Sequence, residues 1–145
     1  MNQMSDPFLQ ILESYKVAVF AKDVEAFLAL YDDEVHVFDL WGAWSLRGTA
    51  AWRGMAVEWF ASVGDDRVIV ESHQAGSICL GDLAIGHAFL TYTAVSADGT
   101  ELRSLDNRIT AALKKVKGVW KIFHEHTSVP IDHASTKAIL RREIS

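Results

Sequence analysis

The chain has 145 residues, a length that suits one domain with a substantial core. Half of its residues are hydrophobic, 23% are charged and the formal net charge is −5, which argues against a surface for nucleic acid or an anionic membrane. No apolar stretch has the length of a transmembrane helix, and residues 1–6 lack the features of an export signal. The lone Cys79 offers no disulfide and no cysteine metal site. We therefore expect a cytoplasmic globular domain.

The first part of the chain has the period of amphipathic helices. Three segments place their apolar residues on one helical face: 8–19, 24–31 and 49–62. The expected N-caps are Ser5 or Asp6 for the first helix, Asp23 for the second and Thr49 for the third. Tyr15 lies on the apolar face of the first helix, so its hydroxyl needs a partner in the interior. Trp52 and Trp59 lie on the apolar face of the third, which is rich enough in indole to form the wall of a cavity.

Residues 34–40, between the second and third helices, alternate and predict a short strand. Asp39 continues the apolar row of Val35 and Val37, and a carboxylate beside a core is costly unless it is hydrogen-bonded or neutralised. It is therefore either a general base with a raised pKa or a cap or ion pair, for instance with Arg108. An aromatic-rich loop, 41–48, follows and contains Trp41.

From residue 67 onward the pattern changes to the period of strands. The expected strands are 67–78, 82–96, 100–115 and the segment between Gly118 and Pro130, joined by turns that contain glycine. Helices followed by a meander predict an α+β fold in which three N-terminal helices pack on a curved antiparallel sheet and a pocket opens at the mouth of the cone. The domain is expected to span 1–130. The polar tail, 131–145, is expected to form a short helix at 134–142 or to fray.

The last strand carries two histidines. Alternation places Trp120, Ile122, His124, His126 and Ser128 on one face. The imidazoles could be a base and its orienter, hydrogen-bond donors to a carbonyl ligand, or a structural pair. Their spacing also lets both reach one metal together with Asp39, but no fourth ligand is evident, and we expect neither a metal nor a cofactor.

Several segments resemble the SnoaL-like branch of the NTF2-like (cystatin-like) superfamily over roughly the whole domain. They are residues 32–39, Gly48 at a helix start, Arg108-Ile109-Thr110 and the closing GVWKIFHEHTSVP. The resemblance implies the α+β cone described above. This fold hosts isomerases, cyclases, dehydratases, epoxide hydrolases and non-catalytic modules, so it does not define a function.

The first forty residues also resemble the bacterial ketosteroid isomerase branch. In that branch a tyrosine late in the first helix is an oxyanion donor and an aspartate at the end of the first strand moves the proton, and Tyr15 and Asp39 stand at the matching places. A protonated aspartic acid completes that site. Asp106 is its loosely aligned counterpart, although Arg108 on the same strand face would keep it ionised.

The sequence thus favours a pocket protein of the SnoaL-like, ketosteroid-isomerase-like type. We expect a cofactor-free isomerase, cyclase or hydratase that moves a proton on a largely apolar carbonyl or carboxylate ligand. Asp39 and Tyr15 are the candidate catalytic residues. The candidate ligand-binding residues are Arg108, His124, His126, Trp59, Trp41 and Asp106.

The alternative is a non-catalytic ligand-binding or association module. The hub of calmodulin-dependent kinases, whose last strand also carries a His-x-His before a serine, is an example. A homodimer is expected in either case. The reason is that five residues of the opposite sheet face make it too apolar to remain in water: Phe123, Val129, Ile109, Ala111 and Leu113.

Overall fold

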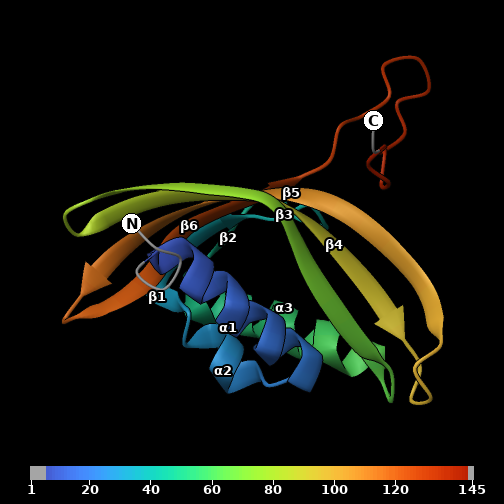
Figure 1. Ribbon diagram of the computed structural model, residues 1–145, viewed down its shortest axis with the longest axis horizontal. Coiled ribbons are helices and arrows are strands. Elements are labelled where there is room, and N and C mark those ends of the chain that lie inside the picture. The colour runs from blue at the N-terminus through green and yellow to red at the C-terminus, as the bar shows by residue number, and fades with distance from the viewer. Residues whose placement is uncertain (1–5, 144–145) are drawn as a thin grey trace.

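The computed structural model describes residues 6–143. Three helices, α1 (Pro7–Ala21), α2 (Val24–Leu28) and α3 (Gly48–Val63), lie on one side of a curved six-stranded sheet (Figure 1). The strands are β1 (Tyr31–Phe38), β2 (Leu46–Arg47), β3 (Arg67–Leu80), β4 (Leu83–Val95), β5 (Glu101–Val116) and β6 (Val119–Ser128). Their order in the sheet is β2-β1-β6-β5-β4-β3. Only the β1–β6 pair is parallel. The predicted α+β cone is confirmed.

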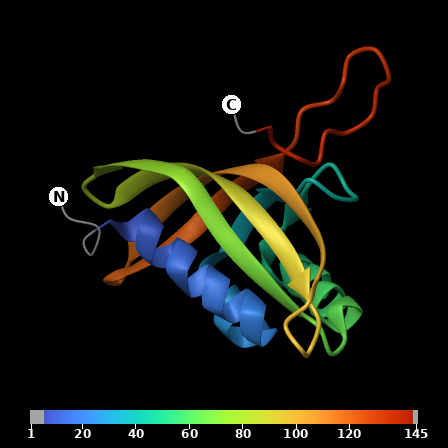
Figure 2. The same ribbon diagram turned by 45° about the vertical axis from the view of Figure 1, so that its right-hand side comes forward.

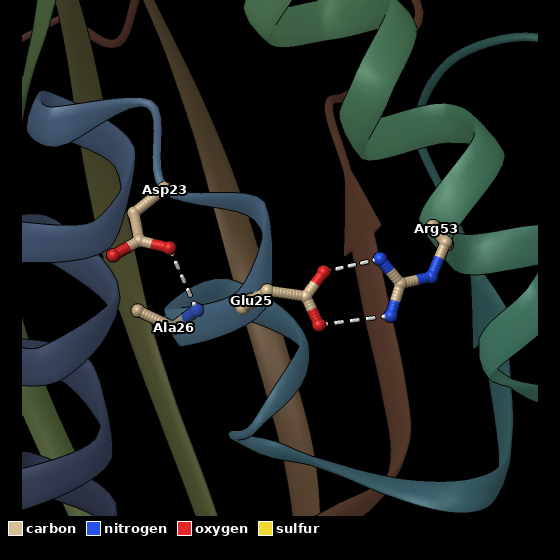
Figure 3. A network of polar contacts seen from close by, with 4 residues as sticks. All are labelled: Asp23, Glu25, Ala26 and Arg53. Atoms are coloured by element: carbon tan, nitrogen blue, oxygen red, sulfur yellow. Dashed lines mark hydrogen bonds and ion pairs between the residues drawn. The ribbon is translucent and has the colours of Figure 1, made fainter.

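The helix starts depend on short acidic side chains, as predicted for the first two helices. Asp6 caps α1 by accepting hydrogen bonds from the amides of Phe8 (2.9 Å) and Leu9 (3.1 Å), and Pro7 occupies the first helical position. The alternative cap, Ser5, lies outside the described residues. Asp23 caps α2 by accepting from the Ala26 amide at 3.0 Å (Figure 3).

Two predicted boundaries are wrong because strand pairing prevails over helical periodicity. The second helix ends at Leu28, and Tyr31 instead opens β1, where it is buried and pairs with Ile122 of β6. The loop predicted for 41–48 contains the short strand β2, which pairs with β1. The third helix therefore starts at Gly48, and its N-cap is Arg47 with no side-chain hydrogen bond, so Thr49 is not its cap.

A surface ion pair joins the two helices that follow α1. The carboxylate of Glu25 in α2 receives hydrogen bonds from both terminal nitrogens of Arg53 in α3 (Figure 3). Both side chains are exposed, so solvent screening makes the contribution of this pair to stability small. The pair therefore links α2 and α3 at the surface without holding the domain together.

The core lies between the helices and the concave face of the sheet. Phe8, Phe27, Leu90 and Leu113 are among its fully buried side chains. Ile109 and Ala111 are buried in the same cluster, so this face of β5 is covered by the chain's own helices. The apolar row that was the basis for expecting a homodimer is therefore mostly core, and that argument is wrong. The homodimer itself stays a prediction.

A β-bulge in β6 changes which residues face the core. Ala112 of β5 pairs with His124, whereas the next residue, Leu113, pairs with Ile122, so Phe123 is an extra residue in the ladder. Alternation therefore restarts at this point. Ile122 is buried in the core, but beyond the bulge Glu125 and Thr127 are the buried residues. The predicted common face of Ile122, His124 and His126 is consequently wrong.

The C-terminal tail neither forms a helix nor frays within the described residues. It stands away from the side of the sheet opposite the helices as a loop (Figures 1 and 2) and is closed by an isolated bridge between Ile131 and Ala138. It then returns to β5, where the Asp106 amide donates to the Leu140 carbonyl at 2.8 Å. No described helix is long and apolar enough to cross a membrane.

Candidate functional site

A cavity of about 690 Å³ opens on the concave side of the sheet. Tyr15 of α1 and the indoles of Trp52 and Trp59 from α3 line it, and Trp41 contributes from the loop that follows β1. This volume suits a medium-sized organic molecule, and its aromatic walls suit an apolar one. Both tryptophans that were predicted to contact a ligand, Trp41 and Trp59, thus lie on the cavity wall.

Three acidic residues line this cavity: Glu58 of α3 is exposed, and the other two lie on adjacent strands. Asp39 directly follows β1, and Glu125 lies in β6, where it pairs with Val37. Thr127 lies two residues farther along β6 and connects the two strand ends. Its hydroxyl donates to Asp39 Oδ1 at 3.1 Å and accepts from the Leu40 amide at 2.9 Å. The parallel pairing of β1 and β6 therefore brings together two acidic residues that are far apart in the sequence.

The carboxyl group of Asp39 is perturbed by its surroundings. Burial raises its pKa above the ordinary value, and hydrogen bonds from Thr127 and from the backbone of Trp41 and Leu40 offset part of this effect. The result agrees with the sequence argument that a carboxylate in an apolar row has a raised pKa. The ion pair with Arg108 that was the alternative does not occur, because Arg108 lies on the other face of the sheet.

Glu125 is the more strongly perturbed of the two acids. Only 3% of the residue is exposed, and this burial raises the pKa of its carboxyl group to about 7. The hydrogen bond from Tyr31 lowers the pKa in part, and the negative charge of Asp39 raises it further. The Tyr31 hydroxyl donates to Oε1 at 2.7 Å. A carboxyl with a pKa near neutrality can both donate and accept a proton at physiological pH.

A pair of tyrosines completes the polar part of the cavity. The hydroxyls of Tyr15 and Tyr92 lie 2.8 Å apart, so one donates to the other and the second hydroxyl keeps a proton for another acceptor. Burial raises the pKa of both, and both therefore stay protonated at neutral pH. Asn107 lies on the same wall, and its buried Oδ1 has no hydrogen-bond partner among the described residues, which is costly unless a ligand or water supplies one.

The other four predicted ligand-binding residues do not line this cavity. Arg108 and His126 border a separate hollow on the opposite face of the sheet. His124 lies on that same face and donates from Nδ1 to the His36 carbonyl at 2.7 Å. Their expected convergence with Asp39 is thus wrong, because the bulge at Phe123 turns the histidines away.

Asp106 also lies outside the cavity and is not the protonated acid suggested by its loose alignment. Burial tends to raise its pKa, but hydrogen bonds from the Arg142 amide (2.6 Å) and the Thr91 hydroxyl (2.7 Å), together with the charge of Arg141, lower the pKa below its ordinary value. Asp106 is therefore ionised at neutral pH.

The sequence analysis missed Glu125, although a signal for it was present. Glu125 follows Phe123 and precedes Thr127 and Val129 in a largely apolar alternating row, which is the same anomaly that singled out Asp39. Strict alternation without a bulge places the face of the two histidines, and not that of Glu125, in the pocket. Among the described residues, no group of three His, Cys, Asp or Glu side chains is placed to hold a metal ion.

Comparison with solved structures defines the class of protein. An NTF2-like protein of unknown function from Pseudomonas putida KT2440 is similar at 25% identity, with a TM-score of 0.82 and 94% of each chain covered. A putative calcium/calmodulin-dependent protein kinase II association domain from Xanthomonas campestris has 14% identity and a TM-score of 0.69, with 83% of this chain and 84% of that one covered. A putative aromatic ring hydroxylase from Novosphingobium aromaticivorans has 19% identity and a TM-score of 0.67, with 87% and 88% covered. The last two likenesses show the fold alone.

The fold is thus the NTF2-like, cystatin-like α+β cone, with a cavity between its helices and its sheet. Within this class, the family model of the SnoaL-like domain matches residues 9–132. The chain belongs to the SnoaL-like domain family. No protein of curated function matches the sequence.

Proposed function

We propose that this protein binds a medium-sized, largely apolar carbonyl compound in its cavity and moves a proton on it. The observation that carries the proposal is the pair of acids, Asp39 and Glu125, whose pKa values are both raised and which line the same cavity as the Tyr15–Tyr92 hydroxyl pair. Perturbed acids beside hydrogen-bond donors in an apolar cavity are typical of proton-transfer sites.

The chemistry follows from these groups. Asp39 as carboxylate removes a proton from the carbon next to the carbonyl, and the electron pair of the broken C–H bond moves onto the carbonyl oxygen as an enolate. A hydroxyl of the Tyr15–Tyr92 pair donates a hydrogen bond to that oxygen. Glu125, which exchanges a proton near neutral pH, assists as the second acid or base. If the ligand has a C=C bond one carbon beyond the one that loses the proton, the enolate extends over that bond, and return of the proton to its far carbon is an isomerisation. Attack by the enolate on a second carbonyl of the same ligand forms a C–C bond and an alkoxide, which takes up the proton, and is a cyclisation.

The charges of the cavity favour a carbonyl over a carboxylate ligand. Arg108, the residue that suggested an anionic ligand, is on the opposite face of the sheet. Among the described lining residues the only cation is Arg103, which is exposed. A ligand carboxylate beside Asp39 and Glu125 would meet like charges in a region of low dielectric.

Proton–deuterium exchange tests the proposal without knowledge of the natural substrate. A panel of cyclic ketones, including 2-tetralone, is incubated with the protein in D₂O, and loss of the proton signals next to the carbonyl is followed by NMR. The protein should accelerate exchange of at least one ketone, and Asp39→Asn with a retained fold should reduce the rate by about a hundredfold or more. Asp98→Asn, in the turn between β4 and β5, is the control.

Equal exchange rates for Asp39→Asn and the unaltered protein would contradict the role of Asp39. Saturable binding of ketones without any catalysed exchange would overturn the enzymatic proposal in favour of a non-catalytic ligand-binding module.

A further inference from the structure

A second hollow, of about 340 Å³, lies on the face of the sheet opposite the cavity. It is bordered by β3, β4, β5 and β6, and its polar lining residues are Gln74, His87, Arg108, Thr110, His126 and Ser128. None of these residues lines the cavity of the proposed reaction. What binds here is therefore independent of the proposed function.

The hollow lies beside an interruption of the β3–β4 ladder. The register of β3 shifts between His73 and Gly76, and Gln74 adopts a positive φ of 53° within this bulge. The His87 ring lies directly over Gly76, where an added Cβ would be 3.0 Å from the imidazole. A larger residue at position 76 would thus displace the imidazole that borders the hollow.

The side chains around the hollow offer hydrogen-bond donors from three neighbouring strands. His87, Thr110 and His126 form one cross-strand row, and Arg108 pairs with Ser128 in the next. Arg108 Nε donates to the Ser128 hydroxyl at 2.8 Å. The two terminal nitrogens of its guanidinium have no hydrogen bond or ion pair with any described residue.

The charge of the hollow is opposite to that of the whole chain. The sequence carries a formal net charge of −5, yet no Asp or Glu is among the residues that line the hollow. The carboxylate on the same strand face, Asp106, is already bonded to Thr91 and to the Arg142 amide and is paired with Arg141 at 3.8 Å. Its hydrogen bonds and ion pair are thus made to Thr91 and the tail, and none of them is made to Arg108.

The C-terminal tail brings a second guanidinium to the edge of the hollow. The side chain of Arg142 lies over the ring of Phe89, with its central carbon 4.4 Å from the ring centroid, and Phe89 lines the hollow. The bond between the Arg142 amide and Asp106 fixes this part of the tail. One arginine and two histidines thus line the hollow, and a second arginine lies beside it on Phe89.

We propose that this hollow is a binding site for a phosphate group. A guanidinium whose terminal nitrogens are free presents two parallel donors that match two phosphate oxygens. The hydroxyls and imidazoles on the neighbouring strands supply donors for the remaining oxygens. A phosphate accepts hydrogen bonds from several directions, as this arrangement of donors requires. The phosphate group can belong to inorganic phosphate or to a phosphomonoester.

Titration of the full chain at constant ionic strength tests the site. The probes are inorganic phosphate and phenyl phosphate, followed by calorimetry and by the NMR signals of the His87 and His126 rings, with sodium chloride as the reference salt. We expect saturable binding that shifts both ring signals. Arg108→Gln should weaken binding roughly tenfold through loss of a charge-assisted bidentate contact. Arg53→Gln, which removes the same charge from the α2–α3 ion pair, should leave it unchanged.

The two probes separate the sources of the phosphate. Tighter binding of phenyl phosphate identifies a phosphomonoester, and equal binding identifies inorganic phosphate. Absence of saturable binding, absence of any shift of the His87 and His126 signals, or equal weakening in Arg53→Gln and Arg108→Gln would overturn the proposal. The ring signals keep the test decisive even if a variant fails to fold, because they are read on the unaltered protein.

Discussion

The hydroxyl of Tyr31 lies 2.7 Å from Oε1 of Glu125, although 94 residues separate them in the chain. Both residues are buried, and they belong to the adjacent parallel strands β1 and β6. The bond from Tyr31 stabilises the ionised form of Glu125, but burial outweighs it and the pKa rises to about 7. The structure thus holds an acid in its interior that is partly protonated at neutral pH.

Glu125 should make the stability of the protein depend on pH in a direction opposite to that of an ordinary paired carboxylate. Its pKa is about 7 in the folded protein against 4.5 as the reference value, so between these pH values the folded state binds more protons than the unfolded state. The contribution of Glu125 to the free energy of unfolding is therefore largest at or below pH 4.5 and falls by about 3 kcal/mol as the pH rises to 7.

Glu125→Gln isolates this effect, because glutamine does not titrate. The free energy of unfolding of the variant minus that of the unaltered protein should increase by about 3 kcal/mol as the pH rises from 4.5 to 7.5. Urea unfolding of both proteins at several pH values measures this difference. A difference between the two proteins that is the same at every pH would show that Glu125 titrates normally.

Tyr15→Phe tests the proposed hydrogen-bond donor. Removal of the hydroxyl breaks its 2.8 Å contact with Tyr92, and loss of an oxyanion donor typically slows proton transfer by about a hundredfold. Deuterium exchange of a responsive ketone gives the rate, and thermal unfolding gives the accompanying loss of stability, about 1 kcal/mol for one hydrogen bond. An unchanged exchange rate would remove Tyr15 from the site and leave Tyr92 as the donor.

Gly86→Ala should destabilise the fold strongly, whereas Gly76→Ala should not. A Cβ at position 86 would lie 2.1 Å from the ring of Phe8, which is 1% exposed in the core and cannot move aside. At position 76 the nearest atoms belong to the exposed His87 ring at 3.0 Å. We expect a loss of about 3 kcal/mol for Gly86→Ala and less than about 1 kcal/mol for Gly76→Ala, measured by chemical unfolding. Similar losses would contradict this account of the core.

The homodimer is now predicted from a different set of residues. Four apolar side chains at the hairpin of β3 and β4, on the face opposite the helices, are more than half exposed: Ile78, Leu80, Leu83 and Ile85. Light scattering after size exclusion should give a dimer at micromolar concentration, and Leu80→Lys should give a monomer. Val17→Lys, at an exposed apolar position of α1, is the matched control. A monomeric unaltered protein would contradict the prediction.

Most of the fold was predictable because local signals and the resemblance agreed. Asp6 with Pro7 marked the start of α1, and the glycine turns marked the strand hairpins. The missed boundary at Tyr31 depends on pairing with Ile122, which is distant in the sequence, and the one at Gly48 on the pairing of β2 with β1. Such pairing outweighs the weak helical preference of a few residues and leaves no mark in a local window.

The candidate site was only partly predictable, for one physical reason. Tyr15 lies in a regular helix, and Val37 and Asp39 both follow the register shift between Tyr31 and His36, so local periodicity placed both candidate side chains on the cavity side. In β6 the extra residue at Phe123 reverses the two faces, and a bulge of this kind has no clear local signature when the inserted residue is itself apolar. Strict alternation therefore predicts the histidines in the cavity and Glu125 on the outer face, which is the reverse of the arrangement in the structure.

The pairing of β1 with β6 also has a consequence for how the site arises during synthesis. Tyr31 pairs with Ile122 and Phe38 with His126, so Asp39 and Glu125 meet only when strands from the two ends of the domain are both present. A nascent chain that still lacks β6 has the helices and Asp39 but no cavity chemistry. Contacts of such long sequence separation also form slowly, so acquisition of the site is expected to be among the last events of folding.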